Sequence, residues 1–461
     1  MLRKTITLLT YLFLCVPAFA FNLSIPKPLE SGLSISIYDT STNHYIYQYQ
    51  SSFPRMIASN MKILTSYMAL DTLGSGYTFD TILVANSLAT DQGILHGDIG
   101  LIGGGDPSLT SGDLSAMFNM LHSKNVRTID GDVIIDNTIF SGKVSSTERN
   151  PNYFAEYSVN PDGLIVDGNM SSITFNKNGK KLQTTIYPFD KSAVLHVRLT
   201  KNKYADCQYH GGDNLKLRYT SSGNLDISGS MPEVCLGYSY YFNLLQPASY
   251  DLIMVQDALA QNNIQLTGKV RFAHISENDF YPIKIVHQSL PLSQLLITMN
   301  FYSNNLYAKT LFMTTALHYT MQNSIDYTQA VMYFMQDVNR HFQTKSMVAQ
   351  NGSGLSRSEV LTTDEMATIL LQIYHSPYYH TILDSLPSPG YYGTLYKSFP
   401  QFKDKLRVKT GTLGDAKNYS GYYMNNGKVY IVTFMLNTSL YAPGVTSLYN
   451  TLVENALLQL N

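Results

Sequence analysis

Apolar and polar positions alternate in the first part of the chain and then change to a helical spacing. Residues 33–39 and 44–49 each alternate on either side of a turn-like segment, 40–43, which predicts a β-hairpin. From residue 61 onward, apolar side chains recur every three or four positions. We therefore expect a helix that begins near Ser59 and buries one face.

The stretch between about residues 71 and 240 has a different pattern of apolar and polar residues. Short apolar runs of strand character are separated by turns rich in Gly, Asn and Asp. These runs cover 81–84, 133–135, 173–175, 193–199 and 225–228. The pattern indicates a β-rich region inserted before the helices resume.

Helical patterns return in the second half of the chain, and strands follow near its end. The helical patterns cover 247–259, 291–299, 304–317, 363–374 and 445–458, and the strand patterns cover 406–408, 419–424 and 428–436. Asn425-Asn426-Gly427, between the last two strands, is a strong hairpin signal. Strands at both ends with helices between them predict an α+β domain whose antiparallel sheet joins the two termini. This domain would be discontinuous, 21–80 and 241–461, with the β-rich insert at 81–240.

Residues 1–20 have the pattern of an export signal. Arg3 and Lys4 precede an apolar run over 5–16, and Ala18-Phe19-Ala20 offers a small-x-small cleavage site. The mature protein is thus expected to start near Phe21 and to lie outside the cytoplasm. No later stretch approaches ~20 consecutive apolar residues, so we expect no membrane span after signal cleavage.

Composition and charge exclude several classes of function. Hydrophobic residues make up 44% of the chain, charged residues 14%, and the formal net charge is −1. These values are typical of a globular protein and give no electrostatic basis for binding nucleic acid. Removal of the signal leaves Cys207 and Cys235, which could form one disulfide in an oxidising compartment or remain as two buried thiols.

The histidines and cysteines give no metal-site pattern. Two cysteines without clustered histidines do not make a zinc site, and no H-E-x-x-H sequence occurs. His375 and His380 lie in a segment rich in Tyr and Pro, which we interpret as a loop with solvated histidines. We expect neither a metal nor a cofactor.

Ser59-Asn60-Met61-Lys62 places a hydroxyl and an amine three residues apart at the start of the predicted helix. That spacing puts both side chains on one helical face. Serine is a weak nucleophile that needs an adjacent base, and lysine can serve when burial and a nearby cation lower its pKa. Alone, this pattern is common by chance, because a helix cap followed by a surface lysine looks the same.

Two further segments make chance a less satisfactory explanation of the Ser59–Lys62 pattern. Ser303-Asn304-Asn305 lies just ahead of an apolar helical run, and Lys409-Thr410-Gly411-Thr412 ends a predicted strand. Each has an ordinary interpretation as a turn or a cap. All three segments, in this order and on these predicted elements, predict a serine acyl-enzyme hydrolase.

The chemistry assigns a separate task to each part of this predicted site. Thr412 would continue an edge strand that pairs with a peptide, and its N–H would be one oxyanion donor beside the Ser59 N–H. Lys409 would supply a cation for a substrate carboxylate, and the same charge would help to keep Lys62 deprotonated.

These motifs resemble the penicillin-recognising serine peptidases, which carry S-x-x-K, S-x-N and K-T-G. The 244 positions from Ser59 to Ser303 exceed the spacing in compact β-lactamases. That gap resembles the class C low-molecular-mass penicillin-binding proteins, the D-alanyl-D-alanine carboxypeptidase/endopeptidase family also called peptidase family S13, which carry two inserted domains there. Other segments similar to this family are 104–109, 351–357 and 390–395.

The resemblance implies a transpeptidase-like fold and a periplasmic enzyme acting on peptidoglycan stem peptides. Ser59 would attack the carbonyl of the penultimate D-Ala, and Lys62 would take its proton. Ser303 would relay a proton to the leaving amine, while Asn305, Lys409, Thr410 and Thr412 would bind the substrate. β-Lactams would acylate the same serine, and D-Ala–diaminopimelate cross-links would be further substrates.

The chain departs from the family in two places that bear on substrate preference. Asn351 stands where relatives often carry an acidic residue, and Gly414 stands where some carry a longer polar side chain. Arg357 has two interpretations, a substrate contact or a structural arginine. The sequence leaves open the balance of the two activities, the formation of a homodimer and the role of the insert.

Two other functions remain as alternatives. A β-lactamase would need a fast deacylating base, but no E-x-x-L-N pattern follows Ser303, and the long insert argues against it. An inactive scaffold could bind peptidoglycan through the insert, although three intact motifs argue against decay of the site.

Overall fold

The structure is a computed structural model that describes residues 21–141, 154–179, 181–190, 192–202, 207, 214–220, 223–276 and 281–460. The predicted export signal, residues 1–20, lies outside the described residues. Within the described part of the chain, no helix is both long and apolar enough to cross a membrane.

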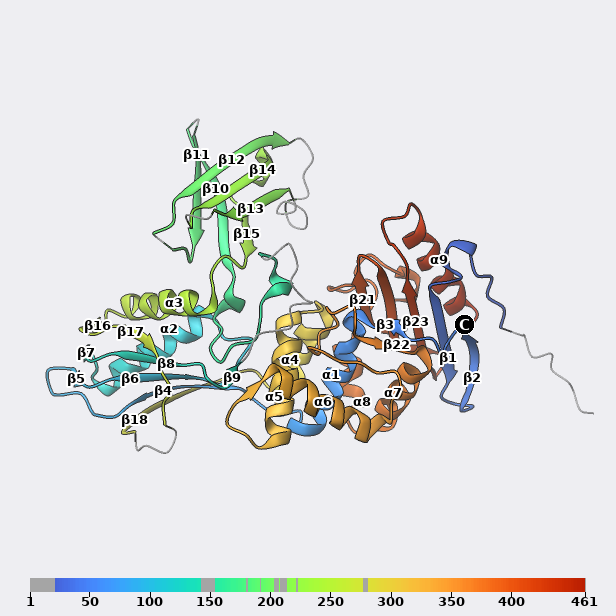
Figure 1. Cartoon of the computed structure of the whole chain (residues 1–461), viewed down its shortest axis with the longest axis horizontal. Helices are drawn as coiled ribbons and strands as arrows, with labels where there is room; N and C mark the ends of the chain where they lie inside the picture. Colours follow the sequence, from blue (N-terminus) through green and yellow to red (C-terminus); the bar gives the residue numbers. More distant parts are fainter. Residues whose placement is uncertain are drawn as a thin grey trace, which may run out of the picture.

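A five-stranded antiparallel sheet, in the order β2-β1-β23-β22-β21, forms the centre of one end of the molecule (Figure 1). Its strands are β1 (Leu33–Asp39), β2 (His44–Tyr49), β21 (Leu406–Leu413), β22 (Ala416–Asn425) and β23 (Lys428–Asn437). β1 pairs with β23 along its whole length, so this sheet joins segments from the two ends of the chain. The β22–β23 hairpin turns at Asn426 and Gly427, both of which have positive φ.

Helices cover both faces of this sheet. α9 (Val445–Leu458) packs on one face, where Val432 and Tyr449 belong to a common core. Six helices form the layer on the other face, where Ile431 is buried. They are α1 (Met61–Leu73), α4 (Leu292–Phe301), α5 (Asn305–Thr320), α6 (Tyr327–Phe342), α7 (Thr363–His375) and α8 (Tyr379–Ser385). Consecutive residues of β23 therefore face opposite cores, as the pleat of a strand requires.

The insert begins with β4 and has its own hydrophobic core. Its first sheet has the order β17-β8-β6-β4-β18, and a smaller sheet has the order β16-β7-β5. The strands are β4 (Asp80–Ala85), β5 (Ile94–His96), β6 (Ile99–Gly103), β7 (Thr128–Asp130), β8 (Val133–Asp136), β16 (Gln265–Leu266), β17 (Val270–Phe272) and β18 (Ile283–Gln288). Two helices, α2 (Ser111–Met120) and α3 (Pro247–Gln261), bury residues in this core.

A second part of the insert stands away from the rest of the molecule (Figure 1). It consists of two three-stranded sheets, ordered β11-β10-β15 and β12-β14-β13. The strands are β10 (Ser171–Asn178), β11 (Lys181–Tyr187), β12 (Leu195–Asn202), β13 (Leu215–Tyr219), β14 (Leu225–Pro232) and β15 (Ser239–Phe242). We call residues 171–242 the upper subdomain.

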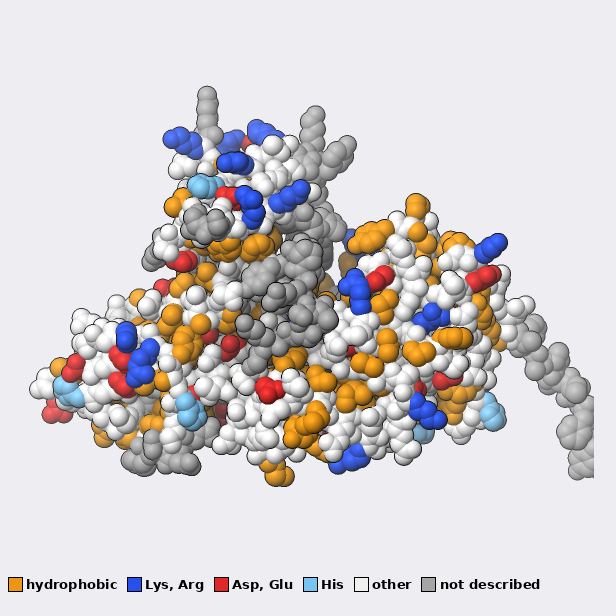
Figure 2. All heavy atoms as spheres, viewed as in Figure 1, with side chains coloured by type: hydrophobic (Ala, Val, Ile, Leu, Met, Phe, Trp, Pro, Cys, Tyr) orange, Lys and Arg blue, Asp and Glu red, His pale blue; other side chains and the backbone are white. Residues whose placement is uncertain are grey.

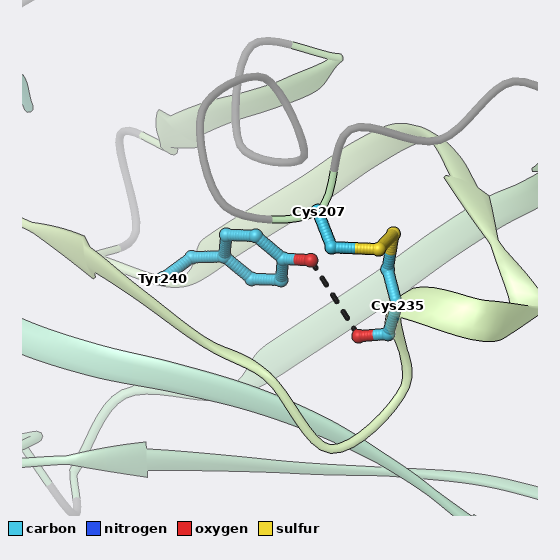
Figure 3. The surroundings of a disulfide bond; sticks show 3 residues. All are labelled: Cys207, Cys235 and Tyr240. Atoms are coloured by element: carbon cyan, nitrogen blue, oxygen red, sulfur yellow. Dashed lines mark hydrogen bonds between the residues drawn. A yellow bond between two sulfur atoms is a disulfide. The ribbon is translucent and has the colours of Figure 1, made fainter. Parts of the chain in front are cut away.

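The two cysteines form a disulfide inside the upper subdomain. Cys207 is bonded to Cys235, and the Tyr240 hydroxyl donates a hydrogen bond to the Cys235 carbonyl at 3.5 Å (Figure 3). Of the two alternatives that the sequence left open, the disulfide is correct.

Short elements complete the fold. The two-stranded pairings join β3 (Arg55–Met56) to β20 (Val360–Leu361) and β9 (Phe140–Ser141) to β19 (Ile325–Asp326). The 3₁₀ helices are η1 (Lys27–Leu29), η2 (Ala58–Asn60), η3 (Leu121–Lys124), η5 (Glu156–Ser158), η6 (Asp167–Asn169), η7 (Glu233–Cys235) and η8 (Pro400–Phe402).

The α+β class is confirmed, but the predicted limit of the insert at residue 240 is wrong. β18 pairs with β4 from Ile283 to Gln288, and α3 buries Met254 and Leu259 in the core of the insert. The structure therefore assigns the region up to residue 288 to the insert, and the helix layer resumes at α4. The described residues of the insert also include the helices α2 and α3, so it is less purely β than its sequence pattern indicates.

The interpretation of the segment around His375 and His380 as a loop is also wrong. His375 is the last residue of α7, and His380 lies in α8. Both histidines are exposed, as expected for solvated side chains.

Candidate active site

Ser59 lies in a turn that β22 holds against the helix layer. The 3₁₀ helix η2 leads directly into α1, and Ala58 has a φ of 46°, in the left-handed region that alanine rarely adopts. Asn418 of β22 donates to the backbone carbonyl just before this turn at 2.8 Å, and Asn60 donates to the Ser420 hydroxyl at 2.6 Å. Side chains of the central sheet thus fix both ends of the turn that presents Ser59.

Two glycines let other segments approach this turn closely. A Cβ atom at Gly354, where φ is +81°, would lie 1.7 Å from the Ala58 carbonyl oxygen. A Cβ atom at Gly411 would lie 3.2 Å from the Ser59 backbone nitrogen. The third motif and the loop around residue 354 therefore both pack directly on the turn that carries Ser59.

Lys62 contacts three groups from three different segments. Its Nζ lies 3.1 Å from Ser59 Oγ, 2.7 Å from Asn305 Oδ1 and 2.7 Å from the Ser353 carbonyl oxygen. The lysine side chain is fully buried, whereas Ser59 is partly exposed. The first and second motifs therefore meet at the Lys62 amine.

The electrostatic surroundings favour a neutral Lys62. Burial is the largest cause and lowers its pKa well below the usual value, and the charges of Lys409 and Lys309 act in the same direction. The Glu359 carboxylate opposes them. Burial also lowers the pKa of Lys409 to about 7, so two buried amines of reduced basicity lie in one site.

The second motif forms a tight connection between α4 and α5. Ser303 has a φ of 59°, and the Asn304 side chain caps α5 by accepting from the Tyr307 N–H at 3.2 Å. Asn305, the first residue of α5, points its amide oxygen at Lys62. Within the described residues, the Ser303 hydroxyl makes no hydrogen bond to the first or third motif.

The insert touches the second motif. Asn304 Nδ2 donates to Glu156 Oε1 at 3.2 Å, and Lys309 Nζ lies 3.4 Å from the Val159 carbonyl. Val159 and Leu306 share a small apolar core. Burial raises the pKa of Glu156. One short segment of the insert therefore braces the start of α5.

The third motif lies on β21, the last strand of the central sheet. The Val408 N–H donates to the Pro387 carbonyl, on the side of β21 away from β22. Because backbone groups alternate along a strand and the pairing to β22 is regular, the N–H of Thr412 faces the same free edge.

The side chains of the third motif differ in exposure and in their contacts. Thr412 is exposed, and the Thr410 hydroxyl donates to Thr394 at 2.7 Å. The Lys409 amine is buried and donates to the Thr410 carbonyl at 2.9 Å.

A loop to which the sequence analysis gave no contact with Lys62 supplies the third partner of this lysine. Asn351 Oδ1 accepts from the Ser353 N–H and hydroxyl at 2.8 and 2.6 Å, which orients the Ser353 carbonyl. Glu359 accepts from the Asn351 N–H at 3.0 Å and is fully buried. The two glycines in Asn351-Gly352-Ser353-Gly354, both at positive φ, were the available signal for this unusual backbone path.

Arg357 and Gly414, two residues near the third motif, lie against residues outside the three motifs. Arg357 pairs with Asp415 at 2.9 Å on the partly exposed turn between β21 and β22. A Cβ atom at Gly414 would lie 3.1 Å from the Tyr441 hydroxyl. The position where relatives are expected to carry a longer side chain is thus flanked by Tyr441.

No group of three or more His, Cys, Asp or Glu side chains suited to a metal ion occurs in the described residues. The functional groups that the site presents are a serine hydroxyl, two buried amines and oriented amides.

Comparison with known proteins decides the family. The model of the D-Ala-D-Ala carboxypeptidase 3 (S13) family matches residues 24–447. The chain belongs to this family. The predicted S13 membership and the predicted class of enzyme, a serine-type D-Ala-D-Ala carboxypeptidase, are therefore confirmed.

Relatives of this S13 protein align over most of their length. It is 26% identical over 420 residues to a D-alanyl-D-alanine carboxypeptidase of an Actinomadura species, covering 86% of this chain and 76% of the relative. It is 24% identical over 450 residues to D-alanyl-D-alanine carboxypeptidase DacB of Haemophilus influenzae, covering 93% and 90%.

Solved structures show the same S13 fold. The crystal structure of penicillin binding protein 4 from Haemophilus influenzae superposes with a TM-score of 0.78 at 21% identity, covering 94% of this chain and 97% of that one. A second structure of that protein, with a TM-score of 0.74 and 21% identity, holds a β-lactam and has the same coverage.

Proposed function

We propose that this S13 protein is a periplasmic enzyme that forms an acyl-enzyme on Ser59. It would release the terminal D-Ala from peptidoglycan stem peptides and also cleave D-Ala–diaminopimelate cross-links. The observation that carries the proposal is the buried Lys62 amine, 3.1 Å from the Ser59 hydroxyl.

The contacts of Lys62 support its role as the base. A neutral amine has two N–H donors and one lone pair. The Asn305 and Ser353 oxygens, each 2.7 Å away, can accept both protons, which leaves the lone pair for the Ser59 hydroxyl. Burial lowers the pKa of the amine and so favours this neutral form, which could accept the proton of Ser59.

In the acylation step, Ser59 Oγ attacks the carbonyl of the penultimate D-Ala, and its proton passes to Lys62 Nζ. The N–H groups of Ser59 and Thr412 would stabilise the oxyanion, since Thr412 lies on the free edge and Gly411 packs on Ser59. The C–N bond then breaks, and Ser303 would relay a proton to the leaving amine. Water afterwards hydrolyses the ester and frees Ser59.

Binding of the substrate would rest on charge and on strand pairing. The terminal carboxylate of the peptide would sit near Lys409 and the Thr410 hydroxyl. Its negative charge would raise the pKa of Lys409 from about 7 and hold this lysine protonated in the complex. The peptide backbone would pair with the free edge of β21, with the Asn305 amide as a further contact.

Endopeptidase action requires no new chemistry. A cross-link joins a D-Ala carbonyl to an amine on a D-centre, as the terminal D-Ala-D-Ala bond does, and only the leaving group is larger. Thr412 is exposed at the end of β21, which supports access for a large leaving group. The predicted signal at residues 1–20 supports a periplasmic location.

Digestion of purified sacculi, followed by mass analysis of the muropeptides, tests this function. Loss of terminal D-Ala would establish carboxypeptidase action, and loss of cross-linked dimers would establish endopeptidase action. Labelling with a fluorescent penicillin that resists heat denaturation and vanishes in Ser59→Ala would establish the acyl-enzyme. Absence of any label would favour the inactive scaffold.

A further inference from the structure

The upper subdomain has a charge that the rest of the protein lacks. Residues 171–242 contain nine Lys and Arg against five Asp and Glu, a net charge of +4, whereas the whole chain carries −1. Figure 2 shows blue Lys and Arg side chains gathered on this part of the molecule. The remaining residues are therefore net acidic, and the positive charge is concentrated on the upper subdomain.

The sheet β12-β14-β13 carries much of this charge on its outward face. Alternate residues of β12 are partly buried, and Leu195, Val197 and Leu199 pack on the core of the insert. The residues between them, including His196 and Arg198, are exposed. Lys216 and Arg218 of β13 are exposed in the same alternation. The four basic side chains thus share one face of one sheet.

The strand register arranges them in two rows across this face. His196 and Arg218 flank Asp226 of the central strand, and Arg198 and Lys216 flank Ser228. Neighbouring strands are roughly 4.8 Å apart, so Arg198 and Lys216 are about 10 Å apart at their Cα atoms with a small hydroxyl between them. A hollow of about 420 Å³ lies here.

The two rows differ in how their charge is balanced. Asp226 pairs with Arg218 at 2.9 Å and with His196 at 3.1 Å. Arg198 and Lys216 form no ion pair within the described part of the chain. The row around Ser228 therefore presents two uncompensated cations on either side of a hydroxyl, an arrangement that suits a carboxylate.

We infer that this face binds the carboxylates of peptidoglycan, at a distance from the residue being cleaved. The inference rests on the proposed function, because a stem peptide with a free D-Ala end carries more carboxylates than amines and is a net anion. The polymer repeats this anion many times, so a second contact on the same enzyme raises the effective concentration of stem peptides at Ser59. The face and the active site would hold different stems of one polymer.

The test is co-sedimentation of the full chain, carrying Ser59→Ala to prevent turnover, with purified sacculi at low ionic strength. Arg198→Gln with Lys216→Gln should weaken binding by roughly fivefold. The matched control, Lys27→Gln with Lys284→Gln, removes the same charge from exposed positions outside the upper subdomain and should bind like the parent. Raising the salt concentration should reduce binding of the parent towards that of the first variant.

Sacculi whose carboxylates have been amidated identify the ligand. They should bind the parent as weakly as unmodified sacculi bind the Arg198→Gln/Lys216→Gln variant. Equal binding of that variant and the parent, or binding that survives amidation, would overturn the inference. Binding to phosphatidylglycerol vesicles in place of sacculi would also overturn it, in favour of a membrane.

Release of D-Ala from a soluble stem peptide separates the two proposals. With Ser59 intact, the Arg198→Gln/Lys216→Gln variant should match the unmodified enzyme, because these residues lie outside the catalytic machinery. Failure of both proteins to release D-Ala would reject the proposed function. Normal release combined with unchanged sacculus binding would reject this inference alone.

Discussion

Basic side chains lie in opposite environments in two regions of this molecule. In the active site Lys62 and Lys409 are fully buried, and burial lowers the pKa of both amines. On the upper subdomain Arg198 and Lys216 are exposed to solvent. Burial makes a lysine available as a base, whereas exposure makes it available as a cation. The same residue type can therefore provide chemistry in one domain and attachment in another.

The largest expected effect comes from removing the buried base. Lys62→Ala should slow acylation by a fluorescent penicillin by ~10²-fold or more, because it removes the proposed acceptor of the Ser59 proton. Lys62→Arg should be equally slow, since a guanidinium does not become neutral in proteins. The rate of label incorporation measures both, with the exposed Lys284→Ala as the control. Normal rates in Lys62→Ala would assign the base elsewhere.

Replacing the other buried amine should weaken the substrate complex. Lys409→Gln keeps a polar side chain but loses the charge that would pair with the substrate carboxylate. A hydrogen bond between charged groups contributes about 1.5–3 kcal/mol, so kcat/KM should fall by about 10- to 100-fold. Steady-state release of D-Ala from a soluble peptide measures this loss. An unchanged kcat/KM would move carboxylate recognition away from Lys409.

The pH dependence should report both amines. The free enzyme needs Lys62 neutral and Lys409 protonated, so kcat/KM should rise with pH as Lys62 loses its proton. Loss of the Lys409 proton, as the pH rises through about 7, should lower kcat/KM. Lys409→Arg keeps its charge in this range and should move the alkaline decline to higher pH. A profile of kcat/KM from pH 5 to 10 provides the measurement. An alkaline decline at the same pH in both proteins would show that another group is responsible.

A smaller effect should come from the contact between the insert and the second motif. Glu156→Ala removes the acceptor for Asn304 and should lower kcat by about threefold, because one ordinary hydrogen bond is lost. Glu156→Gln keeps an acceptor and should restore most of the rate. Equal activity of Glu156→Ala and the parent would mean that the Asn304 orientation is fixed by the α5 cap alone.

Much of the fold followed from local sequence pattern. The strands of the central sheet and the helices α3, α4, α5, α7 and α9 were predicted within a few residues, because the spacing of apolar residues and the turn signals between them are local features of the sequence. The insert boundary was not, since the apolar face of α3 does not specify the core on which it packs. The pairing of β18 with β4 and the packing of α3 in the core of the insert decide that question.

The candidate site, like the fold, could be predicted only in part. Ser59, Lys62 and Lys409 lie in short motifs that side-chain chemistry makes recognisable. The Ser353 contact to Lys62 comes from a backbone carbonyl, which every residue possesses, and it is 291 positions away in the chain. Glu359 holds that loop in place by accepting hydrogen bonds from its backbone N–H groups. Such groups have no distinctive residue signature and become visible only in the folded structure.

The pairing of β1 with β23 has a consequence for biosynthesis. β1 is made near the start of the chain, but its partner, Lys428–Asn437, is made almost at the end. Closing such a long loop is slow, and the insert can fold first because its contacts lie within its own segment. The turn that carries Ser59 is held by Asn418 and Ser420, which also emerge late. A chain still in synthesis therefore lacks the assembled turn that presents Ser59, and we expect hydrolytic activity only when the last strands are in place.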